Sequence, residues 1–99
     1  MTTIGLLARI EAKPEYASEV QTMLRYALRL ACEEEQTVTW FAFRESPTTF
    51  GIFDTFADED GRHAHLEGKI AAALMEVAPT MLSAPPDIRP VDLLATKLP

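Results

Sequence analysis

Two residues of this sequence are well suited to proton chemistry, His65 and Asp54. A histidine side chain titrates near neutral pH, so His65 could accept or donate a proton under working conditions. Asp54 closes an apolar segment and could orient His65 or pair with an arginine. The alternative interpretation is structural, because a hydrogen bond between the two side chains would also stabilise the local fold.

The spacing of the two histidines argues against a metal site. His63 and His65 are two residues apart, so on a helix their rings would point about 200° from each other. The glycines are isolated from one another, and no glycine-rich loop that could hold a flavin or nicotinamide phosphate is present. We therefore expect neither a metal ion nor an organic cofactor.

A second group of candidates lies in segments with strand character. Trp40 and Phe43 could line an aromatic pocket, although packing in a core or an interface would also explain them. Arg44 shares the face of Trp40, because side chains alternate along a strand, and could stabilise a phenolate or a reduced-oxygen intermediate. An exposed arginine at a strand end is the alternative. Arg9 stands among apolar residues, where it could point into a cavity or pair with an acid.

Alternating and β-branched patterns predict four strands that would position these residues. The predicted strands are 4–12, 37–45, 49–56 and 91–98, with a turn at 46–48 and Pro90 at the start of the last strand. An apolar stripe at helical spacing predicts a helix from residue 15 to residue 35. Asp58 is a candidate N-cap for a second helical region, which Gly68 and Pro79 should break or kink.

This order of elements, β-α-β-β-α-β, predicts a single α+β domain over residues 1–99. With right-handed crossovers it is the ferredoxin-like arrangement, a four-stranded antiparallel sheet with the helices on one face. The second and third strands carry large apolar side chains on both faces, more than two short helices can cover. Leaving about 500 Å² of apolar surface wet would forgo on the order of 10 kcal/mol. We therefore expect a homodimer with a closed or nearly closed β-barrel between its sheets, unless the strands are phased differently.

Charge and cysteine content limit the partners and the compartment. The chain has 99 residues and a formal net charge of −6, which disfavours nucleic acid and anionic membranes as partners. One cysteine excludes an intrachain disulfide, and the first apolar run is too short for a signal peptide or a membrane span. These features predict a cytoplasmic protein that handles a small molecule.

The order of elements, the junction Lys13-Pro14 and the pattern around the third strand resemble the antibiotic biosynthesis monooxygenase family. Members of this family are dimeric α+β barrels and include quinol monooxygenases. The family pattern is an acid at the end of the third strand, an aromatic residue two positions later and a histidine eleven positions after the acid. Asp54, Phe56 and His65 match this spacing.

The resemblance covers residues 4–98 and implies a cofactor-independent monooxygenase that oxidises a quinol, a phenol or a polycyclic aromatic molecule with dioxygen. The candidate catalytic residues are then His65, Arg9 and Asp54, and the candidate substrate-binding residues are Trp40, Phe43, Arg44 and Phe56.

Three departures from the family pattern favour a second interpretation. The acid is Asp54 where the family usually has glutamate, and the aromatic residue is Phe56 where tryptophan or tyrosine is common. A second histidine, often found a few residues after the first, is missing from the stretch 68–70. The alternative is therefore a non-catalytic, dimeric small-molecule-binding or accessory protein with the same fold. Haem binding would further require an axial ligand in an open cleft.

Overall fold

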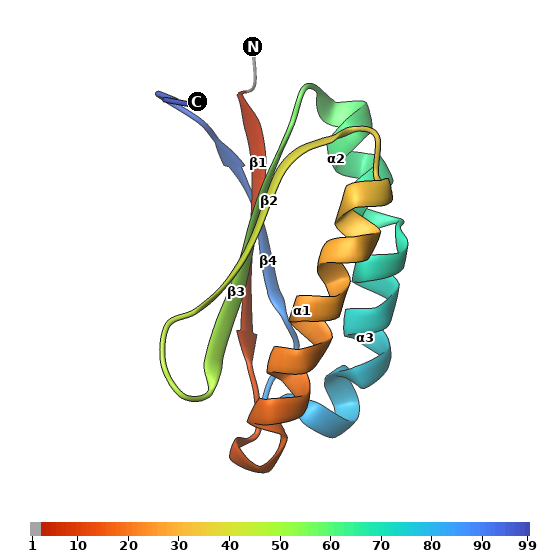
Figure 1. The fold of residues 1–99 in the computed structure, drawn as a ribbon, viewed down its shortest axis with the longest axis vertical. Coiled ribbons are helices and arrows are strands. Elements are labelled where there is room, and N and C mark those ends of the chain that lie inside the picture. Colours follow the sequence, from red (N-terminus) through yellow and green to blue (C-terminus); the bar gives the residue numbers. More distant parts are fainter. Residues whose placement is uncertain (1–2) are drawn as a thin grey trace.

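The computed structural model describes residues 3–99, which form one four-stranded sheet and a layer of helices (Figure 1). In chain order the elements are β1 (Ile4–Glu11), a short 3₁₀ helix (Pro14–Tyr16), α1 (Ala17–Glu33), β2 (Thr37–Arg44), β3 (Thr49–Phe56), α2 (Glu59–Leu66), α3 (Lys69–Met81) and β4 (Asp87–Asp92). All neighbouring strands are antiparallel and the sheet order is β2-β3-β1-β4. This is the predicted ferredoxin-like α+β fold.

The helices begin and end largely where the sequence predicts. Pro14 opens the helical segment, as its fixed φ favours, and the predicted apolar stripe of α1 is buried. The Asp58 carboxylate accepts a hydrogen bond from the Gly61 backbone N–H at 3.0 Å, which confirms the predicted N-cap of α2. Gly68 separates α2 from α3, whereas α3 continues through Pro79 and ends at Met81. In residues 3–99 no helix combines the length and hydropathy needed to span a bilayer.

The fourth strand was predicted at the wrong position. It spans Asp87–Asp92 rather than residues 91–98, and Pro90 lies within it. Asp92 pairs with Ile4, the first residue of β1, and the pairing continues for one more backbone hydrogen bond, from the N–H of Leu93 to the carbonyl of Thr3 at 2.8 Å. Proline is tolerated because β4 is an edge strand that pairs on one side only.

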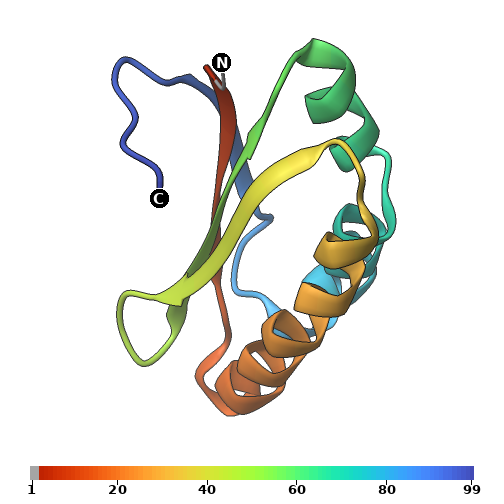
Figure 2. The same ribbon diagram turned by 45° about the horizontal axis from the view of Figure 1, so that its top comes forward.

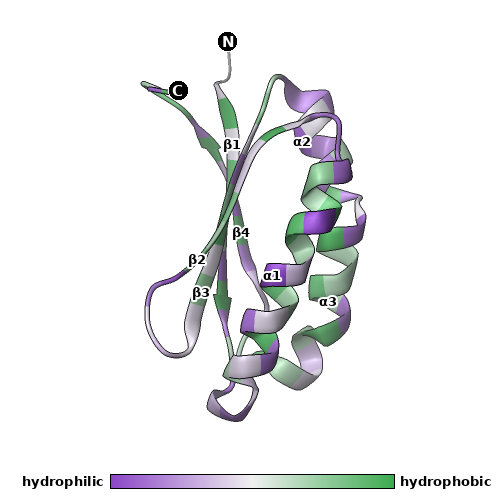
Figure 3. Ribbon diagram, viewed as in Figure 1, coloured by the Kyte–Doolittle hydropathy of each residue, from purple (hydrophilic) through white to green (hydrophobic). Residues whose placement is uncertain are grey.

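The two faces of the sheet have different surroundings. Figure 2 shows the helices on one side and the C-terminal segment on the other. Under the helices, Ile10 and Phe50 of the sheet pack with Val20 of α1 in a continuous apolar core. On the opposite side, the open face, Phe41 pairs with Phe53 and is 56% exposed. Apolar residues recur along the strands and the helices (Figure 3). The exposure of Phe41 shows that part of the apolar surface of the open face is not covered within one chain.

Candidate functional site

A cavity of about 570 Å³ lies between α1 and the edge strand β2. Its apolar lining includes Leu24, Leu28, Trp40 and Phe50, and its polar lining includes Gln21, Arg25 and Arg44. A volume of roughly 300–1,000 Å³ with apolar walls and a few polar groups is typical of small-molecule sites. We name it the α1–β2 cavity.

The periodicity of side chains along β2 and α1 brings the lining residues of the cavity together. Trp40 and Arg44 are four residues apart on β2, so they share the face that looks towards the helices, opposite Asp54 and Phe50 of β3. Gln21 and Arg25 are one turn apart on α1 and therefore lie on one flank of that helix. The Nη1 of Arg44 donates a hydrogen bond to the Oε1 of Gln21 at 2.9 Å, which links the strand to the helix across the cavity.

The α1–β2 cavity is electropositive in an acidic protein. Two guanidinium groups line it, and among the described residues 3–99 no carboxylate or histidine does. The Nε1 of Trp40 is buried and has no hydrogen-bond partner within residues 3–99. The cavity thus offers a flat apolar wall and two permanent cations, a combination suited to an aromatic molecule that carries negative charge.

Of the predicted substrate-binding residues, Trp40 and Arg44 both line this cavity, whereas the rings of Phe43 and Phe56 pack elsewhere. Phe43 touches the rim of the cavity, but its ring lies over Gly51 on the open face, where a Cβ at residue 51 would overlap it. Phe56 is fully buried and packs against the ring of His65, with 5.3 Å between ring centroids.

His65 lies in a separate buried centre, where it bridges two carboxylates. Its Nε2 is 2.8 Å from Oδ2 of Asp54 on β3, and its Nδ1 is 2.6 Å from Oε1 of Glu34 at the end of α1. Thr37 also donates to Oε1 of Glu34 at 2.8 Å. His65 is 8% exposed and Asp54 is 1% exposed. We call this group the His65 centre; it joins α1, β3 and α2.

The two carboxylates determine the protonation of the ring. Burial, the largest single influence, lowers the pKa of His65, but the hydrogen bonds and charges of Asp54 and then Glu34 together raise that pKa above its usual value. The imidazolium form donates from both nitrogens, so an arrangement with a carboxylate oxygen at each nitrogen favours that form. In this arrangement His65 has no free nitrogen to take a proton from a bound molecule or to ligate a haem iron. The contact between His65 and Asp54 is the one that both interpretations of the pair expect, since it would orient the ring and also stabilise the local fold.

The space beside the His65 centre is acidic. A second cavity, of about 400 Å³, is lined by His65, Lys69 and three glutamates, Glu33, Glu34 and Glu35. These carboxylates would repel a phenolate, so this cavity is the poorer place for the expected substrate. Within residues 3–99 no group of three or more histidine, cysteine, aspartate or glutamate side chains could hold a metal ion.

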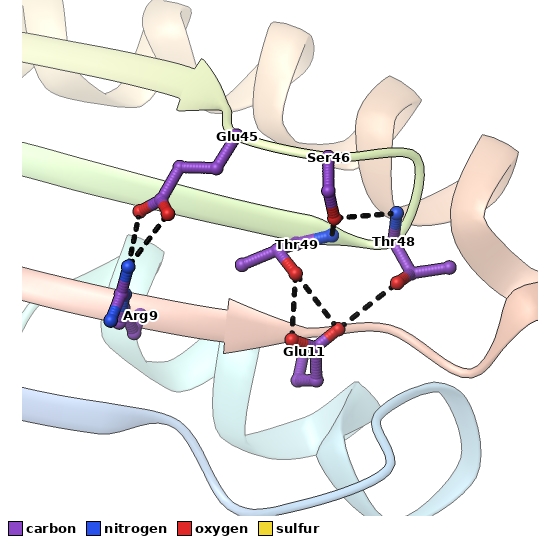
Figure 4. A network of polar contacts seen from close by, with 6 residues as sticks. All are labelled: Arg9, Glu11, Glu45, Ser46, Thr48 and Thr49. Carbon is purple, nitrogen blue, oxygen red and sulfur yellow. Dashed lines mark hydrogen bonds and ion pairs between the residues drawn. The ribbon is translucent and has the colours of Figure 1, made fainter.

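Arg9 lies on the open face, and the sheet separates it from His65. Its Nη2 donates to both carboxylate oxygens of Glu45, at 2.8 and 2.6 Å (Figure 4). Beside it, Glu11 accepts hydrogen bonds from Thr48 and Thr49 at the β2–β3 turn. Because Arg9 and His65 are on opposite sides of the sheet, they cannot contact the same small molecule within one chain.

Sequence reasoning missed three polar residues of these sites, Gln21 and Arg25 in the α1–β2 cavity and Glu34 in the His65 centre. Gln21 and Arg25 fall on the polar side of an amphipathic helix, and their spacing of four residues was the available signal. Glu34 was hidden in a run of three glutamates at a helix end. Which of the three points inward depends on where α1 stops and where α2 packs, and neither follows from local pattern.

Comparisons with known proteins agree with this fold. The solved structure of a protein of unknown function from Nitrosomonas europaea is 55% identical, with a TM-score of 0.97 over 100% of this chain and 96% of that one. A Pseudomonas aeruginosa protein is 18% identical, with a TM-score of 0.82 over 96% and 97% of the two chains. A structure described as an antibiotic biosynthesis monooxygenase is 15% identical, with a TM-score of 0.79 over 93% and 99%. No protein-family model and no curated protein matches the sequence.

Proposed function

Because this chain belongs to the same family as the Nitrosomonas europaea protein of unknown function and has the fold of antibiotic biosynthesis monooxygenases, we propose that it oxidises a phenolic or quinol-type aromatic molecule with dioxygen. The proposed site is the α1–β2 cavity. The observation that carries the proposal is the lining of this cavity, where Trp40 stands with two arginines and no acid among the described residues.

Each part of the lining has a role in this proposal. The apolar wall to which Trp40 contributes would stack against a flat ring. The charges of Arg25 and Arg44 would lower the pKa of a bound phenol, because a nearby cation favours the anionic form. A phenolate is electron-rich enough to pass an electron to dioxygen, so the substrate itself supplies the redox chemistry.

The proposed reaction balances without an external reductant. For a phenol with a free para position, or a hydroquinone with a free ring carbon beside a hydroxyl group, the phenolic proton leaves to water and that ring carbon forms a bond to oxygen. The resulting hydroperoxide loses water, which leaves a para-quinone from the phenol and a hydroxyquinone from the hydroquinone. One oxygen atom of dioxygen becomes the new carbonyl oxygen and the other leaves as water, and the substrate provides all four electrons. Arg9 and the His65 centre do not touch the molecule in this scheme.

Binding without catalysis is the second candidate function. None of the residues that line the α1–β2 cavity, within residues 3–99, is a carboxylate or a histidine that could take the phenolic proton. A dimeric binding or accessory protein would need only the aromatic wall and the cations. The two candidates share a ligand class and differ in whether oxygen is consumed.

Oxygen uptake with 1-naphthol and a panel of hydroquinones tests the proposal. Trp40 is the only tryptophan, so quenching of its fluorescence under anaerobic conditions reports binding in the cavity independently of turnover. We expect uptake that Trp40→Leu and Arg44→Gln abolish and that Arg29→Gln, an exposed arginine of α1 outside the cavity, leaves unchanged. Binding without uptake would establish the second candidate, and neither binding nor uptake would reject both.

We also propose that the open face packs against the open face of a second copy. Its apolar residues, among them Phe41, Phe53 and Leu7, are incompletely covered within one chain. The same face carries two ion pairs, Arg9 with Glu45 and Arg89 with Asp87, so it offers charges of both signs to a second copy related by a two-fold axis.

Sedimentation velocity tests this dimer. Phe41→Glu would place a charge in the interface and should convert a dimer at micromolar concentration into a monomer, whereas Tyr26→Glu, an equally exposed aromatic position on α1, should not. A wild-type monomer at this concentration would reject the proposal.

A further inference from the structure

We infer that the molecule held in the α1–β2 cavity carries a carboxylate beside its aromatic ring, and that Arg25 and Arg44 bind this carboxylate together. The inference rests on the proposed function for the place of the ring, and it adds the chemical class of the ligand.

The first support is the pairing of charges across the molecule. With a net charge of −6, the chain has more carboxylates than cations, and most of its arginines could find one. Three arginines do so: Arg9 with Glu45, Arg62 with Glu59 and Arg89 with Asp87. Within residues 3–99 the other three, Arg25, Arg29 and Arg44, form no ion pair, and two of them, Arg25 and Arg44, line one cavity. Two of the three uncompensated guanidinium groups therefore share the cavity in which an organic molecule would fit.

The second support is the neutral residue that holds Arg44. Gln21 accepts its hydrogen bond through an amide oxygen at 2.9 Å. An amide positions a guanidinium without neutralising it, whereas the Glu45 carboxylate both positions and neutralises Arg9. Because Gln21 and Arg25 are one turn apart on α1, this bond also draws Arg44 to the flank that carries Arg25. Gln21 is thus a positioning residue that keeps the charge of Arg44 available to a ligand.

A carboxylate is the anion that fits this pair. Guanidinium groups present parallel N–H donors that match the two oxygens of a carboxylate, and a planar aryl carboxylate can meet them while its ring lies against Trp40. Both arginines are exposed, so salt should screen their attraction for the ligand.

Calorimetric titration of the full chain under anaerobic conditions tests the inference with two ligands of the same shape, 1-hydroxy-2-naphthoate and its neutral amide. The naphthoate should bind about tenfold more tightly than the amide, and added salt should reduce that advantage. Arg25→Gln and Arg44→Gln should each weaken naphthoate binding about tenfold and leave the amide nearly unchanged. Gln21→Glu, which neutralises Arg44 in place, should act like them. Arg29→Gln is the matched control and should change neither affinity.

The outcomes separate this inference from the proposed function. The inference is overturned if the two ligands bind with equal affinity, or if the arginine substitutions weaken the binding of both ligands equally. Binding of the amide would in that case still support the α1–β2 cavity as the binding site. Arginine-dependent naphthoate binding without oxygen uptake from any phenol would support the inference and reject the oxidation. If neither ligand binds or quenches the fluorescence of Trp40, the inference and the proposed function are both rejected.

Discussion

Both faces of the sheet carry charged pairs and phenylalanines, but these side chains are buried on the helix-covered face and exposed on the open face. Under the helices, the ring of His65 lies between two carboxylates and almost no water reaches it. On the open face, Arg9 and Glu45 form a close ion pair that water still surrounds. The covered face packs its phenylalanines into a core, whereas the open face leaves Phe41 half exposed. Burial rather than residue type therefore decides which of these charges the fold depends on.

Removal of His65 should have the largest effect on stability. His65→Ala leaves the Asp54 and Glu34 carboxylates close together without the cation between them. Breaking a buried pair in this way costs roughly 3–5 kcal/mol. Urea unfolding followed by circular dichroism measures this loss, and His65→Gln, which keeps a hydrogen-bond donor, serves if the alanine variant does not fold. His63→Ala removes an exposed histidine two residues away and should change the unfolding free energy little; equal losses at the two positions would contradict the comparison.

On the open face, the contact between Gly51 and Phe43 should be the most sensitive to mutation. A methyl group at Gly51 would overlap the Phe43 ring, and overpacking of this kind costs about 1–3 kcal/mol. Gly51→Ala should therefore lower the unfolding free energy, and adding Phe43→Ala should recover most of the loss that the methyl group causes. A double-mutant cycle measures this coupling. Additive losses would mean that the ring does not lie over the glycine.

The fold was largely predictable because its signals are local. The hairpin pattern around the turn at 46–48 located β3 at the correct residues, and the Asp58 cap and the Gly68 break follow from side-chain chemistry that acts within a few residues. The position of β4 was not predictable in this way. Its limit is set by β1, because Asp92 pairs with the first residue of that strand, and such a partner is not visible in the apolar run of 91–98.

The sites were only partly predictable for the same reason. The alternation of side chains along a strand placed Trp40 and Arg44 on one face, as the register of β2 and β3 confirms. This alternation alone does not say which face the helices cover, so Arg9 and His65 were predicted to act in one catalytic site although the sheet separates them. Arg25 and Glu34 entered their sites through the packing of α1 on β2 and on α2, which depends on residues distant in sequence.

The stability that the His65 centre contributes should depend on pH, and this effect should be smaller than the total loss in His65→Ala. The pKa of His65 is raised in the folded protein, so folding favours the protonated ring. This contribution is fully present below the ordinary histidine pKa and is lost as the pH rises through the raised value. The difference in unfolding free energy between wild type and His65→Gln should therefore shrink from pH 6 to pH 9. A difference that is constant or grows with pH would show that the ring is not an imidazolium.

The smallest effect is expected at the ion pair of Arg9. Its hydrogen bond and the charge of Glu45 raise the pKa of Arg9, but an arginine is already protonated throughout the physiological range, so no pH dependence follows. Glu45→Gln should leave the unfolding midpoint unchanged at protein concentrations where the chain is monomeric, since water screens an exposed pair. At concentrations where open faces associate, the same substitution should weaken the assembly, because a second copy would exclude that water. Thermal melts and sedimentation across a range of concentrations measure both. A loss of stability in the monomer would mean that Arg9 and Glu45 already act as a buried pair, and the contrast between the two faces would then fail.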